Sequence, residues 1–242
     1  VTGLFRLPPS AAVCFIISIC SGYPAGSKCV LEFYEKGCLS SKDAKKLSVL
    51  CSTSGPLFII GTVGVKMFGN KSAGWQILIA HFASVLLIAL ALALFSKKEE
   101  KPRLQREPVK GNLLYDTFYS AVISVAVAGG FIAFFAVTAQ IMSDFDFLIV
   151  FEKFFAMFTD GQSAKAAALG LVEMTIGCRK LSAAQGGLSI PLAGFLITFG
   201  GVSILMQQLA YFSKAGVKTL YFIGVKILQA TLCFLILLLI GA

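Results

Sequence analysis

The strongest constraint on this chain is a set of apolar stretches long enough to cross a lipid bilayer. Three are uninterrupted: Gly74–Phe95, Phe118–Met142 and Thr219–Ile240. A helix of about 20 apolar residues spans a hydrocarbon core of about 30 Å, so each stretch predicts one transmembrane helix. A fourth stretch, Ser189–Phe212, is also long enough but contains Pro191 and two adjacent glycines.

The composition leads to the same class of protein. Apolar residues make up 57% of the 242 residues, only 14% are charged, and the mean hydropathy is +0.85. A soluble domain typically carries about 25% charged residues, because its surface must face water. Lipid must therefore cover much of this chain. We predict an all-α integral membrane protein, folded as a polytopic helical bundle.

The net charge of +9 does not indicate a nucleic-acid partner. The basic residues fall between the apolar stretches, and cytoplasmic loops of membrane proteins collect Lys and Arg. The clearest case is residues 96–112, with six basic and three acidic side chains. We expect this segment to be a cytoplasmic linker in a bacterial cytoplasmic membrane protein, with the lipid bilayer as its partner.

Nothing in the sequence favours an enzyme. The seven cysteines lack the spacing of a zinc site, and His81, the only histidine, cannot form a metal site or a catalytic triad alone. The motifs of serine hydrolases, zinc proteases and nucleotide-binding loops are missing. We therefore expect no catalytic residue, no metal and no cofactor.

Three further apolar stretches are too short to cross a bilayer: Ala11–Cys20, Gly55–Phe68 and Ala164–Ile176. A helix that stops inside the hydrocarbon leaves peptide groups without partners, which is tolerated only where other helices or an aqueous cavity surround it. We therefore expect discontinuous or re-entrant helices. The mixed-charge stretch Glu32–Lys46 predicts two short peripheral helices, the second capped by Ser40 or Ser41.

The two sides of the linker repeat one order of features. A broken segment is followed by a glycine-containing apolar run, Gly55–Gly61 or Gly194–Gly200, and then by a full-length helix. Aligning the two closing helices places His81 opposite Lys226. Paired interrupted segments in corresponding positions of two halves indicate a transporter with a binding site near the middle of the membrane.

This repeat divides the chain into residues 1–95, the linker 96–112, and residues 113–242. The sequence begins with Val1 instead of Met, so we expect the first repeat to be incomplete at its N-terminus. Nothing in this division indicates an oligomeric state.

The first break is the main candidate for binding a solute, and its candidate residues are Ser21, Gly22, Tyr23, Pro24, Gly26 and Lys28. Gly22 and Gly26 allow a tight turn or a close approach to a ligand, and Pro24 stops a continuous helix. A helix that begins near Ala25 would direct free N–H groups at an anion, to which Lys28 adds a full charge. The alternative is a plain helix exit, with Lys28 extended to the lipid headgroups.

Two other segments add candidates. Gly177 and Arg179 repeat the combination of glycine and cation in the second half. Ser54 and Gly55 belong to a run of small polar residues, Cys51–Pro56. The hydroxyl groups of this run either line a path for a solute or cap a re-entrant helix, and both readings stay open.

Glu173 and His81 are candidates for coupling or gating. An intramembrane carboxylate usually faces a cavity or pairs with a cation, so Glu173 either takes up a coupling proton or cation, or pairs with Lys28. His81 forms an interhelical hydrogen bond or takes part in proton transfer. Lys226 is expected to extend its ammonium group to the headgroups. Hydrogen bonds between helices are expected from Gln140, Gln207 and Gln208.

Four segments together resemble a known family: Phe5–Pro8, Ser21–Lys28, Ser54–Val63 and Met67–Asn70. The chain is similar there to sporulation integral membrane proteins with nucleoside-recognition (Gate) domains. The resemblance is specific over Leu4–His81 and weaker from Tyr115 onward, where Gly170–Leu181 and Pro191–Gly201 fit a second Gate repeat. It implies a role in endospore formation, in which the family is linked to moving dipicolinic acid towards the forespore. It also implies a Gate fold distantly similar to parts of concentrative nucleoside transporters.

We therefore expect two inverted Gate-like repeats that pass a small organic anion across the membrane by alternating access. The resemblance suggests dipicolinic acid as the anion and the outer forespore membrane as the location. Two other functions stay open: a nucleoside or nucleobase permease, and a spore-membrane assembly protein that transports nothing.

Overall fold

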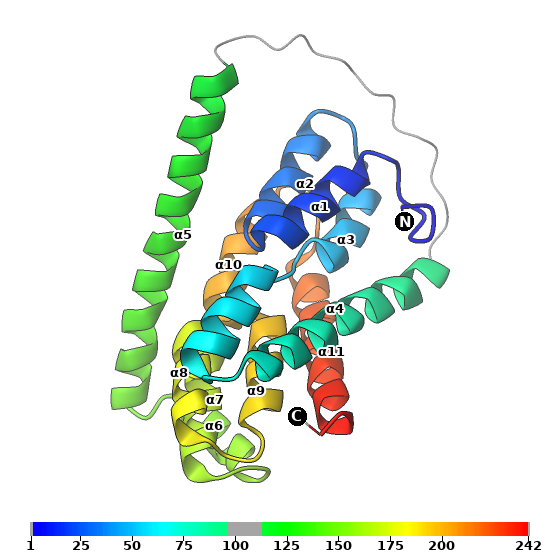
Figure 1. The fold of residues 1–242 in the computed structure, drawn as a ribbon. Coiled ribbons are helices and arrows are strands. Elements are labelled where there is room, and N and C mark those ends of the chain that lie inside the picture. Colours follow the sequence, from blue (N-terminus) through cyan, green and yellow to red (C-terminus); the bar gives the residue numbers. More distant parts are fainter. Residues whose placement is uncertain (1, 96–112, 242) are drawn as a thin grey trace.

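The computed structural model describes residues 2–95 and 113–241, and within these residues every regular element is a helix (Figure 1). The elements are α1 (Ala11–Ser21), α2 (Ala25–Glu35), α3 (Ser41–Leu50), η1 (Leu57–Met67), α4 (Lys71–Leu94), α5 (Leu113–Asp144), α6 (Ile149–Ala156), α7 (Gly161–Val172), α8 (Met174–Ala184), α9 (Ser189–Phe199), α10 (Gly201–Phe212) and α11 (Thr219–Leu239). The predicted all-helical class is confirmed. The predicted linker lies outside the described residues.

Four helical stretches are long and apolar enough to cross a membrane: Lys71–Leu94, Leu114–Asp144, Ser189–Phe212 and Thr219–Leu239. They correspond to the four stretches expected from the sequence. The third is not one helix, because α9 ends at Phe199 and α10 begins at Gly201. The adjacent glycines noted in the sequence therefore mark a real interruption.

Local sequence explains where the first-half helices begin. The Asn70 side chain accepts hydrogen bonds from the N–H groups of Ser72 and Ala73, at 2.9 and 3.2 Å, and so caps α4. Ser40 caps α3 in a reciprocal capping box with Asp43. The expected second peripheral helix is therefore α3. The other helix expected within Glu32–Lys46 is not separate, because residues 32–35 form the end of α2, which begins at Ala25.

The helices pack around two long elements, α4 and α11. The α11 helix packs against α9 and α4, and α4 also packs against η1. A Cβ atom on Gly64 of η1 would lie only 2.6 Å from the Cα atom of Gly74 in α4, so the two backbones touch. Small residues allow this close packing between helices in membranes.

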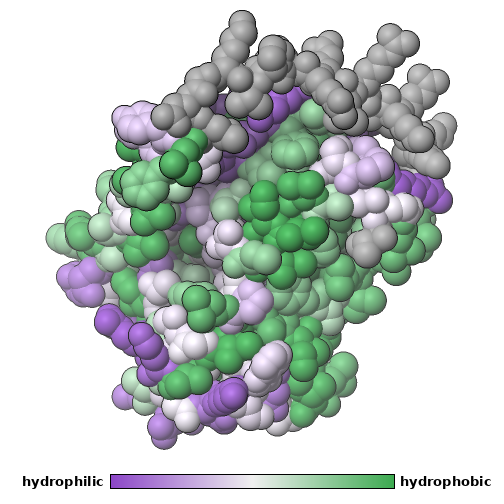
Figure 2. All heavy atoms as spheres, turned by 45° about the horizontal axis from the view of Figure 1, so that its top comes forward, coloured by the Kyte–Doolittle hydropathy of each residue, from purple (hydrophilic) through white to green (hydrophobic). Residues whose placement is uncertain are grey.

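The α5 helix runs along one side of the bundle and contacts α7 and α10 (Figure 1). Only 6% of its most apolar window is buried, against 39% in α4 and α11. Its exposed side chains include Phe118, Val125 and Phe134. Hydrophobic side chains also cover a broad area of the face shown in Figure 2. Lipid is the solvent that such a surface requires, in agreement with an integral membrane protein.

Candidate functional site

Four helix interruptions bring the two halves of the chain together. They lie at Gly22–Pro24 between α1 and α2, Cys51–Pro56 between α3 and η1, Glu173 between α7 and α8, and Gly200 between α9 and α10. An interruption inside a membrane frees peptide N–H and C=O groups, and each must find a partner. The partners of these peptide groups determine which polar atoms this region can offer to a ligand.

The two first-half interruptions touch each other. Gly22 has φ 71°, in the left-handed region, and α2 begins at Ala25 as expected. A Cβ atom on Gly22 would lie 2.8 Å from the backbone nitrogen of Gly55, and one on Gly26 would lie 2.5 Å from the carbonyl oxygen of Cys51. Only glycine allows both approaches. Side chains larger than hydrogen would push the two interruptions apart.

Tyr23 links this pair to the second half. Its hydroxyl donates a hydrogen bond of 2.8 Å to the carbonyl oxygen of Ile197 and lies 3.4 Å from the sulfur of Met174. The Ile197 carbonyl belongs to the last turn of α9, where no further turn supplies an N–H group. A side chain of the first half therefore satisfies a peptide group that an interruption in the second half has freed.

Glu173 forms the third interruption. Its backbone is extended, with φ −132° and ψ 108°, and its carboxylate accepts hydrogen bonds from the N–H of Ile176, at 2.8 Å, and from the Thr175 hydroxyl. Glu173 is fully buried, and within the described residues its Oε1 atom has no hydrogen-bond partner. The break expected at Gly177 lies earlier, at Glu173, because this carboxylate caps α8.

The fourth interruption is built from glycines. Gly200 and Gly201 have φ 94° and 65°. A Cβ atom on Gly201 would lie 2.9 Å from the carbonyl oxygen of Gly170, so this turn packs directly on the backbone near the α7–α8 break. Gly177, inside α8, also packs on Gly170, with 2.4 Å from a hypothetical Cβ to the Gly170 Cα atom. Gly177 therefore serves close helix packing.

The two basic candidates do not meet at the interruptions. Lys28 is half-buried, and its ammonium group donates to the hydroxyls of Ser120 and, at 2.8 Å, Ser124 in α5. Arg179 is exposed on α8. The pairing considered for Lys28 and Glu173 is not among the contacts of the described residues, since each has other partners.

His81, on α4, forms hydrogen bonds with one residue of the first half and one of the second. Its Nε2 atom accepts a hydrogen bond of 3.1 Å from the backbone N–H of Ser54. A backbone N–H can only donate, so a neutral ring must carry its proton on Nδ1, which lies 2.9 Å from the Thr198 hydroxyl oxygen and donates to it. His81 therefore holds the α3–η1 interruption against α9, which is the interhelical bond expected of it.

Lys226 is the residue that the sequence interpretation misjudged. It lies on α11 and is fully buried, and its ammonium group donates a hydrogen bond of 2.9 Å to the carbonyl oxygen of Ser52. The expected extension to the headgroups is wrong, because the α3–η1 interruption offers a free carbonyl inside the bundle. Among the described residues no carboxylate forms an ion pair with Lys226. The alignment of His81 with Lys226 was the signal that could have found it.

Several polar atoms around Lys226 also lack partners. The Ser52 hydroxyl oxygen is buried without a hydrogen bond within the described part of the chain. Gln229, on the same face of α11, donates 2.9 Å to the carbonyl oxygen of Val49, but its own amide oxygen has no partner there. We call Ser52, Ser54, His81, Thr198 and Lys226 the central polar cluster.

Within the described residues, the glutamines selected from the sequence form no hydrogen bond between helices. Gln140 donates to Asp144 and Gln207 to Ser203, each within its own helix. Both amide atoms of Gln208 are buried without a partner in the described residues. A glutamine that was not selected, Gln229 of α11, donates instead to the Val49 carbonyl oxygen in α3.

The central polar cluster combines one ammonium group, one imidazole and several hydroxyls, all buried. A desolvated ammonium group strongly favours an anion beside it, and hydroxyls can donate to carboxylate oxygens. The cluster is shielded on all sides in this conformation. A solute would therefore reach it only after the surrounding interruptions separate.

Comparison with known proteins finds similarity to a sporulation integral membrane protein. The chain is 26% identical, over an alignment of 259 positions, to "Sporulation integral membrane protein YlbJ" of Bacillus subtilis (strain 168). The alignment covers 93% of this chain and 62% of that relative, so the chain spans less than two thirds of its length. No family model matches the chain, and no solved structure matches it. The chain is thus similar over most of its length to an integral membrane protein, which agrees with its four membrane-length helices.

Proposed function

We propose that this protein is a secondary transporter that passes a small organic anion through the central polar cluster. The observation that carries the proposal is Lys226, a fully buried ammonium group whose only protein partner in the described residues is the Ser52 carbonyl oxygen. An ion inside a membrane protein is costly unless a counter-charge accompanies it. A carboxylate on the solute would supply that charge.

The interrupted helices support this use of the site. They place peptide groups and small hydroxyls around the ammonium group, and they allow local movement that a continuous helix would resist. The two halves meet here through Tyr23 and His81. Rocking of one half against the other, as two inverted Gate-like repeats, would open the cluster to each side in turn.

Dipicolinate is the solute we propose to test first. It is a small planar dianion, and the relative named above is a sporulation protein. One carboxylate would pair with Lys226, and hydroxyls such as that of Ser52 would donate to the other. The direction would be towards the forespore, across its outer membrane.

The test is uptake of radiolabelled dipicolinate by the purified protein in proteoliposomes. Unlabelled dipicolinate should compete, whereas the neutral pyridine-2,6-dicarboxamide, of similar shape, should not. Replacing Lys226 by Met removes the charge and keeps an apolar side chain of similar length. We expect uptake to fall roughly 100-fold, the usual effect of deleting one partner of a buried charge pair.

The matched control is Lys218→Met, which removes an exposed charge just before α11 and should leave uptake unchanged. Equal loss in both variants would contradict a specific role of Lys226. Uptake of uridine that survives Lys226→Met would favour a nucleoside permease. No uptake at all by an oriented, folded preparation would contradict transport and favour the assembly role.

Glu173 is the proposed coupling residue, because its second carboxylate oxygen is buried without a partner in the described residues. Glu173→Gln keeps an oxygen that can cap α8 but removes the ionisable group. We expect uptake by this variant to lose its dependence on a proton or cation gradient. Gradient-driven uptake equal to that of the wild type would assign coupling to another residue.

A further inference from the structure

We propose that Tyr23 and Glu173 form a proton-controlled switch on the contact between the two halves of the chain. The inference rests on the coupling role proposed above for Glu173. It deepens that role by naming the coupling ion as a proton and Tyr23 as the positioning residue through which the proton acts. Its evidence is the single donor of Tyr23, the unpartnered oxygen of Glu173, and the place of Ile197 beside the central polar cluster.

The Tyr23 hydroxyl has one hydrogen to donate, and it donates it to the carbonyl oxygen of Ile197, at 2.8 Å. The same hydroxyl lies 3.4 Å from the sulfur of Met174, the residue that follows Glu173 in the chain. Tyr23 also interacts electrostatically with Glu173 itself. The hydroxyl therefore uses one acceptor in the second half while another lies close by.

This other acceptor is the Oε1 atom of Glu173. The side chain is fully buried, and its Oε2 atom accepts from the N–H of Ile176, at 2.8 Å, whereas Oε1 has no partner within the described residues. A neutral carboxyl group tolerates an unpartnered oxygen far better than an ionised one, for which burial without a donor is costly. When Glu173 loses its proton, its Oε1 atom therefore needs a donor, and the Tyr23 hydroxyl supplies it.

The switch moves one proton and one hydrogen bond. Glu173 releases its proton to water on one side of the membrane, and the Tyr23 O–H turns from the Ile197 carbonyl oxygen to the new carboxylate. Tyr23 keeps its own proton throughout and changes only its acceptor. Uptake of a proton by Glu173 from the other side restores the bond to Ile197.

The bond that the switch breaks lies beside the central polar cluster. Ile197 is followed by Thr198, whose hydroxyl accepts from His81 at 2.9 Å, so two neighbouring residues of α9 are bonded to the first half. The Ser54 side chain also contacts the Tyr23 hydroxyl. Loss of the Tyr23 bond weakens the hold of the first half on α9. Ionisation of Glu173 therefore favours the separation that admits a solute to the central polar cluster.

Few other titratable groups lie where they could take the place of Glu173. Cys178, one turn further along α8, is buried and interacts electrostatically with it. The α9 helix, which supplies the Ile197 carbonyl, has no titratable side chain. The remaining titratable residues on the elements that pack against α7 and α8, or on α7 and α8 themselves, are not buried: Lys66, Tyr115, Asp116, Tyr119, Asp144, Glu152, Lys153, Lys165, Arg179, Lys180 and Tyr211.

The experiment is pH-induced infrared difference spectroscopy on the purified full chain in lipid bilayers. Raising the pH should remove the C=O band of a buried carboxylic acid and, in parallel, shift a tyrosine band, which ring-deuterated tyrosine identifies. Glu173→Gln keeps the bond between Tyr23 and Ile197 and should lose both changes. Tyr23→Phe should keep the carboxyl change and lose the tyrosine shift. Because Glu173→Gln leaves Tyr23 in place, the test does not depend on the folding of Tyr23→Phe.

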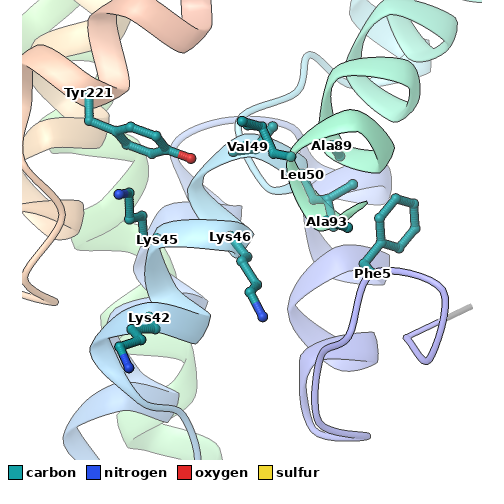
Figure 3. A pocket seen from close by; sticks show the side chains of 10 residues that line it. Phe5, Lys42, Lys45, Lys46, Val49, Leu50, Ala89, Ala93 and Tyr221 are labelled. Carbon is teal, nitrogen blue, oxygen red and sulfur yellow. The ribbon is translucent and has the colours of Figure 1, made fainter. Parts of the chain in front are cut away.

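The matched control is Tyr221→Phe, which removes a tyrosine hydroxyl at the start of α11. The Tyr221 ring lies in a cavity of about 460 Å³, with the Lys45 nitrogen 4.2 Å from the ring centre (Figure 3). No described residue that lines this cavity belongs to α7, α8 or α9. Phenylalanine keeps a ring face for Lys45, so this variant should give the spectra of the wild type.

Uptake gives the second measurement. An imposed proton gradient should change the rate of dipicolinate uptake by the wild type and by Tyr221→Phe, and this response should be lost in Tyr23→Phe. A tyrosine shift that persists in Glu173→Gln would overturn the switch. So would a wild-type response to the gradient in Tyr23→Phe, or uptake that responds to a sodium gradient while the spectra stay constant with pH.

The spectra do not require transport, so the two proposals can fail separately. Coupled carboxyl and tyrosine changes in a preparation without uptake would support the switch and contradict the transporter. Uptake that requires Lys226, without coupled changes, would support the transporter and overturn the switch.

Discussion

Two helix interruptions in this protein, α3–η1 and α9–α10, differ in how their freed peptide groups find hydrogen-bond partners. The first opens over six residues, Cys51–Pro56, and its freed peptide groups are met by side chains from other helices, His81 and Lys226. The second closes within two glycines that press on the backbone near Gly170. An interruption can therefore either direct its peptide groups at side chains of other helices or bring two backbones together.

The difference follows from residue size and polarity. At Gly200 the backbone N–H still donates to the carbonyl oxygen of Leu196, at 2.7 Å. This N–H group therefore needs no partner from another helix. At Ser52 and Ser54 the peptide groups lie outside any helix and need distant partners. We expect mutations at the glycine break to affect folding, and mutations at the polar break to affect transport.

The largest effect is expected for Gly201→Ala. The residue has φ 65°, and the added Cβ atom would lie 2.9 Å from the Gly170 carbonyl oxygen. Left-handed strain and overpacking together should lower the free energy of unfolding by about 2–4 kcal/mol. Unfolding by a denaturing detergent series would measure it. The control is Gly129→Ala in α5, where a Cβ atom meets nothing within 4 Å and stability should stay level or rise. Equal destabilisation by Gly201→Ala and Gly129→Ala would show that the backbone contact at Gly201 has no special role in stability.

A smaller loss of stability is expected for His81→Phe. The change leaves the Ser54 N–H and the Thr198 hydroxyl without their partner in a buried site. The free energy of unfolding should fall by about 2 kcal/mol, the usual cost of orphaned buried groups. The comparison variant His81→Gln can replace part of these bonds and should recover part of the loss. If His81→Gln instead removed the pH dependence of uptake, His81 would take part in proton transfer.

The smallest effect on stability is expected for Ser52→Ala. Its hydroxyl has no partner in the described residues, so removing it should change the free energy of unfolding by less than about 0.5 kcal/mol. Uptake of dipicolinate should nevertheless fall about 10-fold, as expected for one lost hydrogen bond to a charged solute. Unchanged uptake would show that the solute does not bind the Ser52 hydroxyl.

Helices and three of the interruptions, at Gly22–Pro24, Cys51–Pro56 and Gly200, could be predicted, because glycine and proline act locally. Pro24 and the left-handed Gly22 stop α1 whatever surrounds them, and Gly200–Gly201 does the same between α9 and α10. The break at Glu173 could not be located in this way, since no glycine or proline lies beside it. There the cap that the buried carboxylate gives to α8 marks the new helix.

The site was harder to predict than the fold. Lys28 and Arg179 looked like anion ligands because they follow glycines in the sequence, yet one pairs with hydroxyls of α5 and the other is exposed. Lys226 looked like a residue that reaches the headgroups. Which of these cations turns inward depends on what packs against its helix, and sequence spacing along one helix does not contain that information.

The amino-acid sequence by itself determined that this chain is a helical membrane protein, because long apolar stretches and few charges allow no other solvent for its surface. It also determined where glycine and proline interrupt those stretches. Only the tertiary structure decided that Lys226 faces the Ser52 carbonyl oxygen and that three lysines of α3 share a cavity with Tyr221. Such contacts join residues more than 150 positions apart, and only the packing of helices brings their partners within bonding distance.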